Sequence, residues 1–253
     1  MNRTHPPSSC TGLTLLELLL AMSLTAILLL GLVQLVSAAG SAARLQDNQA
    51  TLQDRARYAT NLLSSTISEA GFSPEPWTTE FDSIAISPET EDGVSPHSDR
   101  LVVSTRSDRN CFGNINPDRD ADGRPRFFLR KSAFDLNGSG HLARSCRYGP
   151  SAGRLTTQVR RQGLVPGVES FQCLFGLDSD HDGNVDKWVR AGHWPDETQI
   201  IGVRAALLLA SPDAVASETG RTWPILDSDR RPRADGKLRE LVELTLAIRS
   251  RGG

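Results

Sequence analysis

Hydrophobic residues dominate one long stretch near the start of the chain, which reads "GLTLLELLLAMSLTAILLLGLVQLV" from Gly12 to Val36. After Gly12, more than twenty residues are apolar apart from two threonines, one serine, one glutamine and a single acid, Glu17. An apolar helix of roughly 20 residues is long enough to cross a bilayer. The pattern therefore predicts a membrane-spanning helix over residues 13–36.

The segment that follows is amphipathic. No proline occurs from Ser37 to Ala70, and apolar side chains recur there at steps of three, four or seven residues, which is the helical period. These positions are Leu45, Leu52, Ala56, Ala59, Leu63, Ile67 and Ala70. We therefore expect the helix to continue through residues 37–71, with Gly71 as its C-terminal cap.

Residues 72–253 change to short apolar runs separated by polar loops. Val242, Leu244, Leu246 and Ile248 alternate with polar or small residues, which is typical of a half-buried strand. Strands are expected near residues 100–106, 126–131, 154–161, 167–178, 198–211 and 237–250. A long helix followed by strands predicts an α+β fold with a mainly antiparallel sheet covering the helix.

Composition is ordinary for a folded domain of 253 residues, with 38% hydrophobic and 23% charged residues. The formal net charge is −2, which does not indicate a nucleic-acid partner. Two arginine clusters, Arg160 with Arg161 and Arg230, Arg231 with Arg233, are interpreted as solvated surface. The histidines outside the first twelve residues, His97, His141, His181 and His193, have no obvious nucleophile or ligand spacing. We therefore do not predict an enzyme.

Glu17 is the informative residue of the apolar run. An acid inside the hydrocarbon region costs on the order of 2.5 to 3.5 kcal/mol, so it indicates a function and a partner. Cleavage after Gly12 would make Leu13 a free N-terminus and Glu17 the fifth residue, about one helical turn from an ammonium group. A helix N-terminus also favours negative charge.

A short polar leader, "MNRTHPPSSCTG", ending in Gly12 before an apolar helix with Glu at its fifth position resembles the class III signal of type IV prepilins and type II secretion pseudopilins. The resemblance implies that a membrane-embedded prepilin peptidase cleaves between Gly12 and Leu13 and methylates the new amine. It also implies that Glu17 meets the N-terminus of a neighbouring subunit during assembly. Leu13 stands where the family usually has Phe or Met.

The sequence of residues 72–253 shows which pilin family the chain resembles. The order of "CFG" at Cys111, a second cysteine, "GLVPGVESF", "FGLDSDHDGNVDKWV", "VRAALLLAS" and "ELTLAIRS" is similar to the PilW family of minor pilins. This family implies a low-abundance subunit near the tip of a type IV pilus that primes assembly with other minor pilins and a tip adhesin. Its implied location is the inner membrane of a Gram-negative bacterium, with the head in the periplasm and later on the pilus at the cell surface. The helix would contact the major pilin, and an inner-membrane assembly platform would add the subunit to the filament.

Other interpretations stay open. A minor pseudopilin of the type II secretion machine, such as the J subunit, shares this architecture. An ordinary secretory signal cut after Ala39, or a plain membrane anchor, would instead leave a periplasmic protein such as a calcium-dependent binding protein.

Three cysteines remain after the leader, in a body that the membrane signal places in the oxidising periplasm. We expect Cys111 and Cys146 to form a disulfide, because both occur in irregular sequence rich in Gly, Asn and Ser. Cys173 alternates with Phe171 and Phe175 and is predicted to be a small core residue.

Two aspartate-rich loops are candidate calcium sites. Asp178, Asp180, Asp182 and Asp186 occupy positions one, three, five and nine of a loop with Gly183 at position six, which is spacing that aims oxygens at one calcium ion. Val189 replaces the bidentate glutamate at position twelve, so affinity would be weak, and a solvated acidic turn is the alternative. A second loop repeats the front half of the pattern with Asp118, Asp120 and Asp122, followed by arginines.

Overall fold

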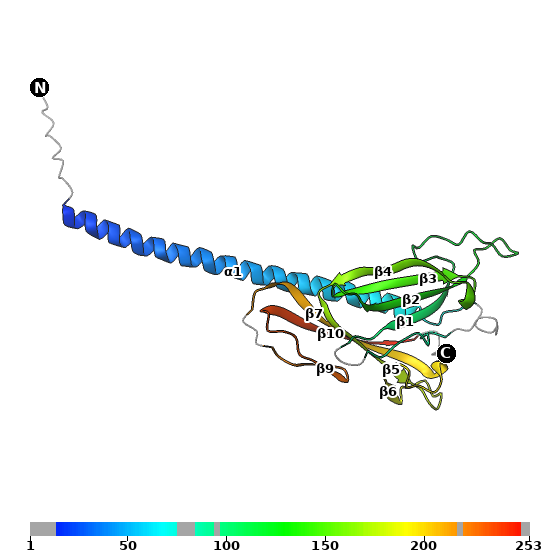
Figure 1. The fold of residues 1–253 in the computed structure, drawn as a ribbon. Coiled ribbons are helices and arrows are strands. Elements are labelled where there is room, and N and C mark those ends of the chain that lie inside the picture. The colour runs from blue at the N-terminus through cyan, green and yellow to red at the C-terminus, as the bar shows by residue number, and fades with distance from the viewer. Residues whose placement is uncertain (1–13, 75–83, 94–96, 217–219, 249–253) are drawn as a thin grey trace, which may run out of the picture. The chain divides into compact units, whose positions relative to one another are not determined.

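A computed structural model describes residues 14–74, 84–93, 97–216 and 220–248. One helix, α1 (Leu15–Ser68), precedes every strand in the chain (Figure 1). The chain divides into two compact units, residues 1–47 and residues 48–253, and α1 begins in the first and ends in the second. The expected helix is therefore present, with ends within two residues of the predicted 13–70.

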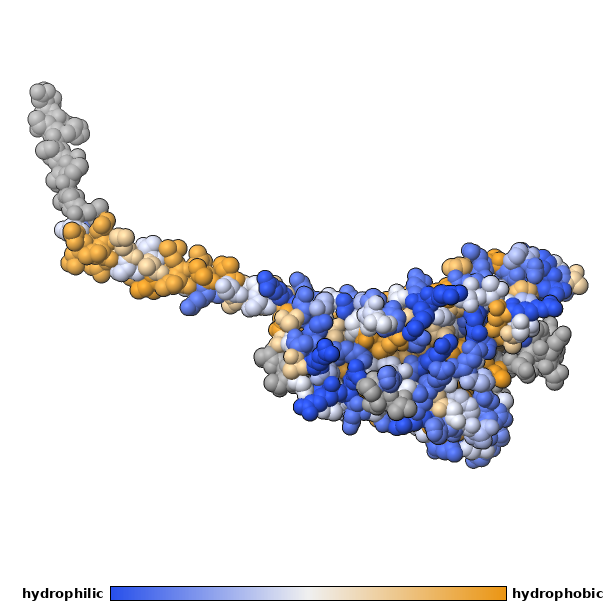
Figure 2. Space-filling view, viewed as in Figure 1, coloured by the Kyte–Doolittle hydropathy of each residue, from blue (hydrophilic) through white to orange (hydrophobic). Residues whose placement is uncertain are grey.

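In the first unit, the side chains of α1 lie on the surface. Each large apolar residue from Leu15 to Val36 is more than half exposed. Figure 2 shows hydrophobic residues covering this part of the helix. Such a surface is stable only where lipid or other apolar helices cover it.

In the second unit, one stripe of α1 is buried, as the helical period predicts. Its apolar members are Leu52, Ala56, Ala59, Leu63 and Ile67. Leu45, in the first unit, is half-buried. Gly71 has a positive φ of 70°, as expected of a residue that ends a helix, but its N–H donates to the Ser104 carbonyl and not back to α1.

The head contains two four-stranded antiparallel sheets in place of the single sheet expected from the sequence. The first has the order β1-β2-β3-β4 and the second β10-β7-β5-β6. The first consists of β1 (Leu101–Ser107), β2 (Phe128–Leu136), β3 (His141–Gly149) and β4 (Thr156–Pro166). The second consists of β5 (Val168–Leu177), β6 (Lys187–Val189), β7 (Ile200–Ala214) and β10 (Lys237–Ala247).

A hairpin of β8 (Trp223–Ile225) and β9 (Ser228–Arg230) lies between β7 and β10 in the sequence. Its Ile225 packs with Ala206 and Leu208 of β7 on the second sheet. The sequence patterns did not predict β3, β6, β8 and β9. Three of these have only three residues, and β3 carries His, Arg or Ser at four of its nine positions, so none shows a clear two-residue alternation.

One hydrophobic core joins the helix to both sheets. Leu63 and Ile67 of α1 are fully buried in the same cluster as Phe134 of β2 and Phe171 and Phe175 of β5. Because apolar residues of all three layers are removed from water together, the second half of α1 belongs to the head and stabilises it.

Candidate functional site

The N-terminal end of α1 is held by Thr14. The backbone N–H of Glu17 donates to Thr14 Oγ1 at 3.3 Å and to the Thr14 carbonyl at 3.1 Å. A threonine followed three residues later by glutamate is the sequence signature of a capping box. This hydrogen bond between Thr14 and Glu17 was not predicted, although the segment "TLLE" carries the signature. Gly12 and Leu13, the expected cleavage and methylation positions, lie outside the described residues.

Glu17 is exposed, and it is the one charged side chain in residues 14–36. The hydroxyls of Ser23 and Thr25 donate to the carbonyls of Leu20 and Ala21 at 2.9 and 2.7 Å. Polar side chains that bond within their own helix need no partner in an apolar environment. A carboxylate has no donor of its own, so among these three side chains it is Glu17 that requires an external positive group.

Cys111 and Cys146 form a disulfide with a Cα–Cα distance of 5.9 Å. The pairing favoured from the sequence is present, but the reason given for Cys146 is wrong. Cys146 lies in β3 and is fully buried, whereas Cys111 follows β1 in the loop that begins at Asp108. The bond therefore fixes this loop to the sheet, where Tyr148 packs beside it.

Cys173 is a free, buried thiol of β5 in the main core, as predicted. Burial raises the pKa of this thiol well above its usual value. Its backbone N–H donates to Asp99 Oδ2 at 2.7 Å, so its position is tied to a buried carboxylate that the sequence analysis did not single out.

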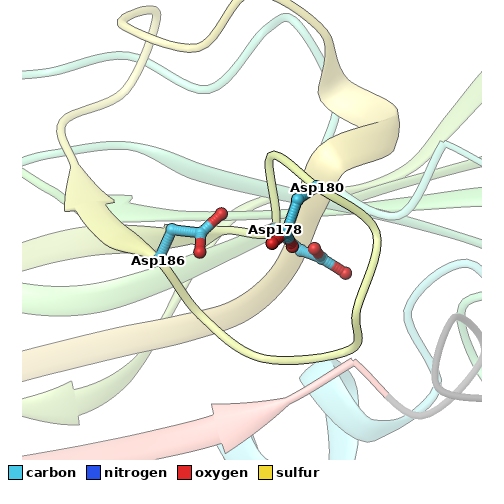
Figure 3. A group of neighbouring side chains, drawn as sticks. All are labelled: Asp178, Asp180 and Asp186. Atoms are coloured by element: carbon cyan, nitrogen blue, oxygen red, sulfur yellow. The ribbon is translucent and has the colours of Figure 1, made fainter.

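The loop between β5 and β6 gathers three of its four predicted aspartates. Carboxylate oxygens of Asp178, Asp180 and Asp186 all lie within 4.8 Å of one another (Figure 3). Asp178 is buried at the end of β5 and accepts the N–H groups of Asp182 and Gly183, and Asp186 accepts that of Ser179 at 2.7 Å. These bonds hold the loop closed around the carboxylates.

Asp182 does not join this cluster. Its two oxygens accept the backbone N–H and the side-chain amide of Asn184 at 2.7 and 3.0 Å, and these hydrogen bonds lower the pKa of Asp182. The structure thus brings together three of the four predicted aspartates, and Asp182 is not among them. The carboxylate of Asp182 is held by hydrogen bonds within its own turn, and the spacing of aspartates in the sequence does not reveal this.

The second loop behaves as a turn. Asp120 Oδ1 accepts the N–H groups of Asp122 and Arg124 at 2.9 and 2.8 Å, and Gly123 has a φ of 78°. Among the residues that the structure describes, only the loop after β5 brings three metal-ligating acids together.

The remaining candidates form no cluster of metal-ligating groups with one another among the described residues. Arg161 of β4 forms an ion pair with Asp135 at 3.3 Å and donates to the Leu136 carbonyl at 2.8 Å. His97, His181 and His193 are exposed, and His141 is half-buried.

Comparisons with known proteins match two parts of the chain, the N-terminal helix and most of the head. The family model "Type IV Pilus-assembly protein W" matches residues 135–250, from the end of β2 through β10. The model "Prokaryotic N-terminal methylation motif" matches residues 7–33, which contain Gly12, Leu13 and Glu17. The chain is therefore similar to the PilW family of type IV pilus proteins. In this PilW-like chain the methylation motif coincides with the exposed apolar helix, which fits membrane anchoring by α1.

Among solved structures, the chain is similar to the type IV-like pilin TTHA1219 from Thermus thermophilus. The two share 14% sequence identity with a TM-score of 0.49, over 80% of this chain and 98% of that one. No curated protein matches the PilW-like chain.

Proposed function

We propose that this chain is a minor pilin that enters a type IV pilus through α1. It is inserted in the inner membrane with its head in the periplasm, cleaved after Gly12 and methylated on Leu13. It then takes a place at or near the pilus tip, where it primes assembly with other minor pilins and carries a tip adhesin. Twitching motility, adhesion or DNA uptake would depend on it through the pilus.

The observation that carries the proposal is a single exposed acid at the start of an exposed apolar helix. Glu17 stands in the first turn of α1, and the apolar surface that follows it needs a cover. A neighbouring subunit would supply both the apolar cover and, through its N-terminal amine, the positive charge. An ion pair formed in a medium of low dielectric is much stronger than one in water, so the pair would set the register of adjacent helices.

The experiment must separate this role from the capping role of the same residue. Glu17→Ala should leave cleavage after Gly12 intact, as measured by N-terminal mass spectrometry, and should remove the protein from sheared pili. Thr14→Ala loses the cap and keeps the charge, so it should still be cleaved and incorporated. Wild-type incorporation of Glu17→Ala would overturn the proposal, and so would a mature chain starting at Gly40.

The PilW match supports a pilus over the secretion machine. Deletion of the gene should abolish twitching motility and leave type II secretion intact. The reverse result would assign the chain to the secretion pseudopilins.

We also propose that the loop after β5 takes calcium weakly, through Asp178, Asp180 and Asp186. Three carboxylate ligands without a bidentate glutamate at position twelve are fewer than a tight site uses, so affinity in the range of about 0.1 to 1 mM is expected. The ion would replace repulsion among the three acids with attraction and fix the β5–β6 connection.

A further inference from the structure

The two four-stranded sheets of the head have four outer strands, β1, β4, β6 and β10. Three of these are unsuited to pairing with a strand of another protein. At β1, Ser87 N–H donates to the Val102 carbonyl and Ser104 N–H to the Ala85 carbonyl, so residues 85–87 already occupy that edge. At the opposite edge, β4 pairs with β3 through three register shifts. Arg161 of β4 also has a φ of 40°. Bulges and exposed charges of this kind protect edges from unwanted pairing. The third edge, β6, has three residues only.

The fourth edge, β10, is irregular only at its start, between Lys237 and Arg239, and it carries one exposed acid, Glu243, which restricts the kind of strand that can pair there. It pairs with β7 in unbroken register from Arg239 to Ala247, and in the described part of the chain β7 is the one strand paired with it. Figure 1 shows β10 beside β7. The N–H of Ile248 donates to the Ile201 carbonyl of β7, and Leu238 N–H donates to Ser211 Oγ. Because antiparallel ladders alternate, the even residues of β10 face β7 and the odd ones, such as Glu243 and Thr245, direct N–H and C=O outward.

The side chains along this edge are apolar and incompletely covered. Leu238, Val242 and Leu246 pack against the main core yet remain half-buried. An additional strand beside β10 would complete their burial while it satisfied the outward backbone groups, and this is how peptides add to exposed sheet edges.

The glutamates of β10 indicate which kind of segment could pair with this edge. Glu240 and Glu243 are the charged residues of positions 240–247, and neither forms an ion pair with another described residue. The nearby Arg239 is 4% exposed and is already bound to Glu169 at 2.8 Å and to Asp235 at 3.0 Å, so it does not neutralise them. A second copy of this strand would bring two more glutamates and no free basic residue from positions 240–247, and like charges across a strand pair are destabilising.

We propose that β10 is a docking edge for an extended segment of another protein, with apolar residues on the face of Leu238, Val242 and Leu246 and with lysine or arginine on the other face, opposite Glu243. The segment adds to the second sheet as a fifth strand. This inference concerns the head and does not depend on how α1 assembles, so the two proposals fail separately.

The test uses the full chain in detergent and a fluorescein-labelled peptide, Lys-Val-Lys-Val-Thr-Val-Lys-Val. Fluorescence anisotropy measures its binding to wild type and variants. Glu243→Pro removes one outward N–H without touching the β7 ladder, and proline is tolerated at such edge positions. Glu243→Ala is the matched control that loses the charge and keeps the N–H. Glu243→Lys reverses the charge and leaves the backbone unchanged. This variant tests the charge requirement if the proline variant does not fold.

We expect Glu243→Pro to weaken binding by about tenfold, from the lost interstrand hydrogen bond, and Glu243→Ala by about threefold. Glu243→Lys should favour a peptide with glutamate in place of lysine. Hydrogen exchange of amides in residues 241–247 should slow when the lysine peptide binds.

Four outcomes would overturn the proposal. The first is that the lysine peptide does not bind the wild type, and the second is that it binds the wild type and Glu243→Pro with equal affinity. The third is that the wild type binds the lysine peptide and the glutamate peptide with equal affinity. The fourth is that hydrogen exchange slows in β4 and not in β10. A wild-type dimer by light scattering that Glu243→Pro abolishes would show that the occupant is a second copy, which also contradicts it.

Discussion

The side-chain oxygen of Asn48 on α1 accepts a hydrogen bond from the backbone N–H of Asp213, 3.1 Å away and 165 residues later in the chain. Asn48 is 3% exposed, and it is the first residue of the head unit. Farther along the same helix, Arg55 Nη1 donates to the Ala210 carbonyl at 3.1 Å. Two polar contacts to the end of β7 thus set the register in which the helix enters its own core.

Replacing Asn48 with alanine should therefore destabilise the head. The Asp213 N–H would lose its partner, and a buried side chain would be truncated, at a cost of about 1 to 2 kcal/mol. Urea unfolding of the full chain in detergent, followed by tryptophan fluorescence, measures the change in free energy. The neighbouring, exposed Gln49→Ala should stay within about 0.5 kcal/mol of wild type. Equal stability of the two variants would show that the contact does not hold the helix.

Asp99 should make stability depend on pH. Burial raises the pKa of Asp99 from 3.8 to about 6, against the opposing effect of hydrogen bonds from the Gly93 and Cys173 N–H groups. Because the folded state holds this proton more tightly than the unfolded state, the contribution of Asp99 is most favourable below pH 4 and is lost as pH rises to 6. The loss amounts to about 2 to 3 kcal/mol.

Denaturant unfolding between pH 4 and pH 7 checks this expectation. Asp99→Asn should flatten the decline, whereas the exposed Asp229→Asn should keep it. A wild-type protein that becomes more stable from pH 4 to pH 6, with Asp99→Asn following the same course, would contradict the assignment.

The Cys111–Cys146 disulfide should be a major source of stability. It closes a segment of 35 residues, and the chain-entropy model assigns about 3 to 4 kcal/mol to such a loop. The double variant Cys111→Ala with Cys146→Ala should lose that amount in urea unfolding. Reduction of the wild type should produce the same loss, and the reductant should not affect the double variant. A reductant effect of equal size on both proteins would place the cause elsewhere.

Calcium binding should depend on Asp186. Calorimetric titration of the wild type with calcium should give heat at millimolar ion, and Asp186→Asn should abolish it by removing one of the three clustered carboxylates. Asp122→Asn, in the loop that forms a plain turn, should leave the heat unchanged. No heat from the wild type at millimolar calcium would remove the proposal.

Sequence patterns predicted the parts of this protein that depend on near neighbours in the chain. The length of α1 followed from an unbroken apolar run and a helical period, and β5 and β10 followed from alternation. Short apolar runs between polar loops indicated β1 and β7. Each of these is a local pattern, and the periods are those that backbone geometry imposes. The Thr14 to Glu17 cap was also present as a local signal.

The rest required the tertiary structure, because it depends on partners far away in the sequence. Nothing local marks Asn48 as buried or Asp99 as a partner of Cys173. Cys146 occurs in sequence that reads as irregular, yet β2 and β4 make it a strand residue by pairing on both sides.

The sequence by itself thus determined a pilin-like membrane helix with one acid and the kind of head that follows it. Only the tertiary structure decided how the strands divide into two sheets, which aspartates meet, and which edge stays open. Periodicity reports which face of an element is apolar, but it does not specify which other apolar face will cover it.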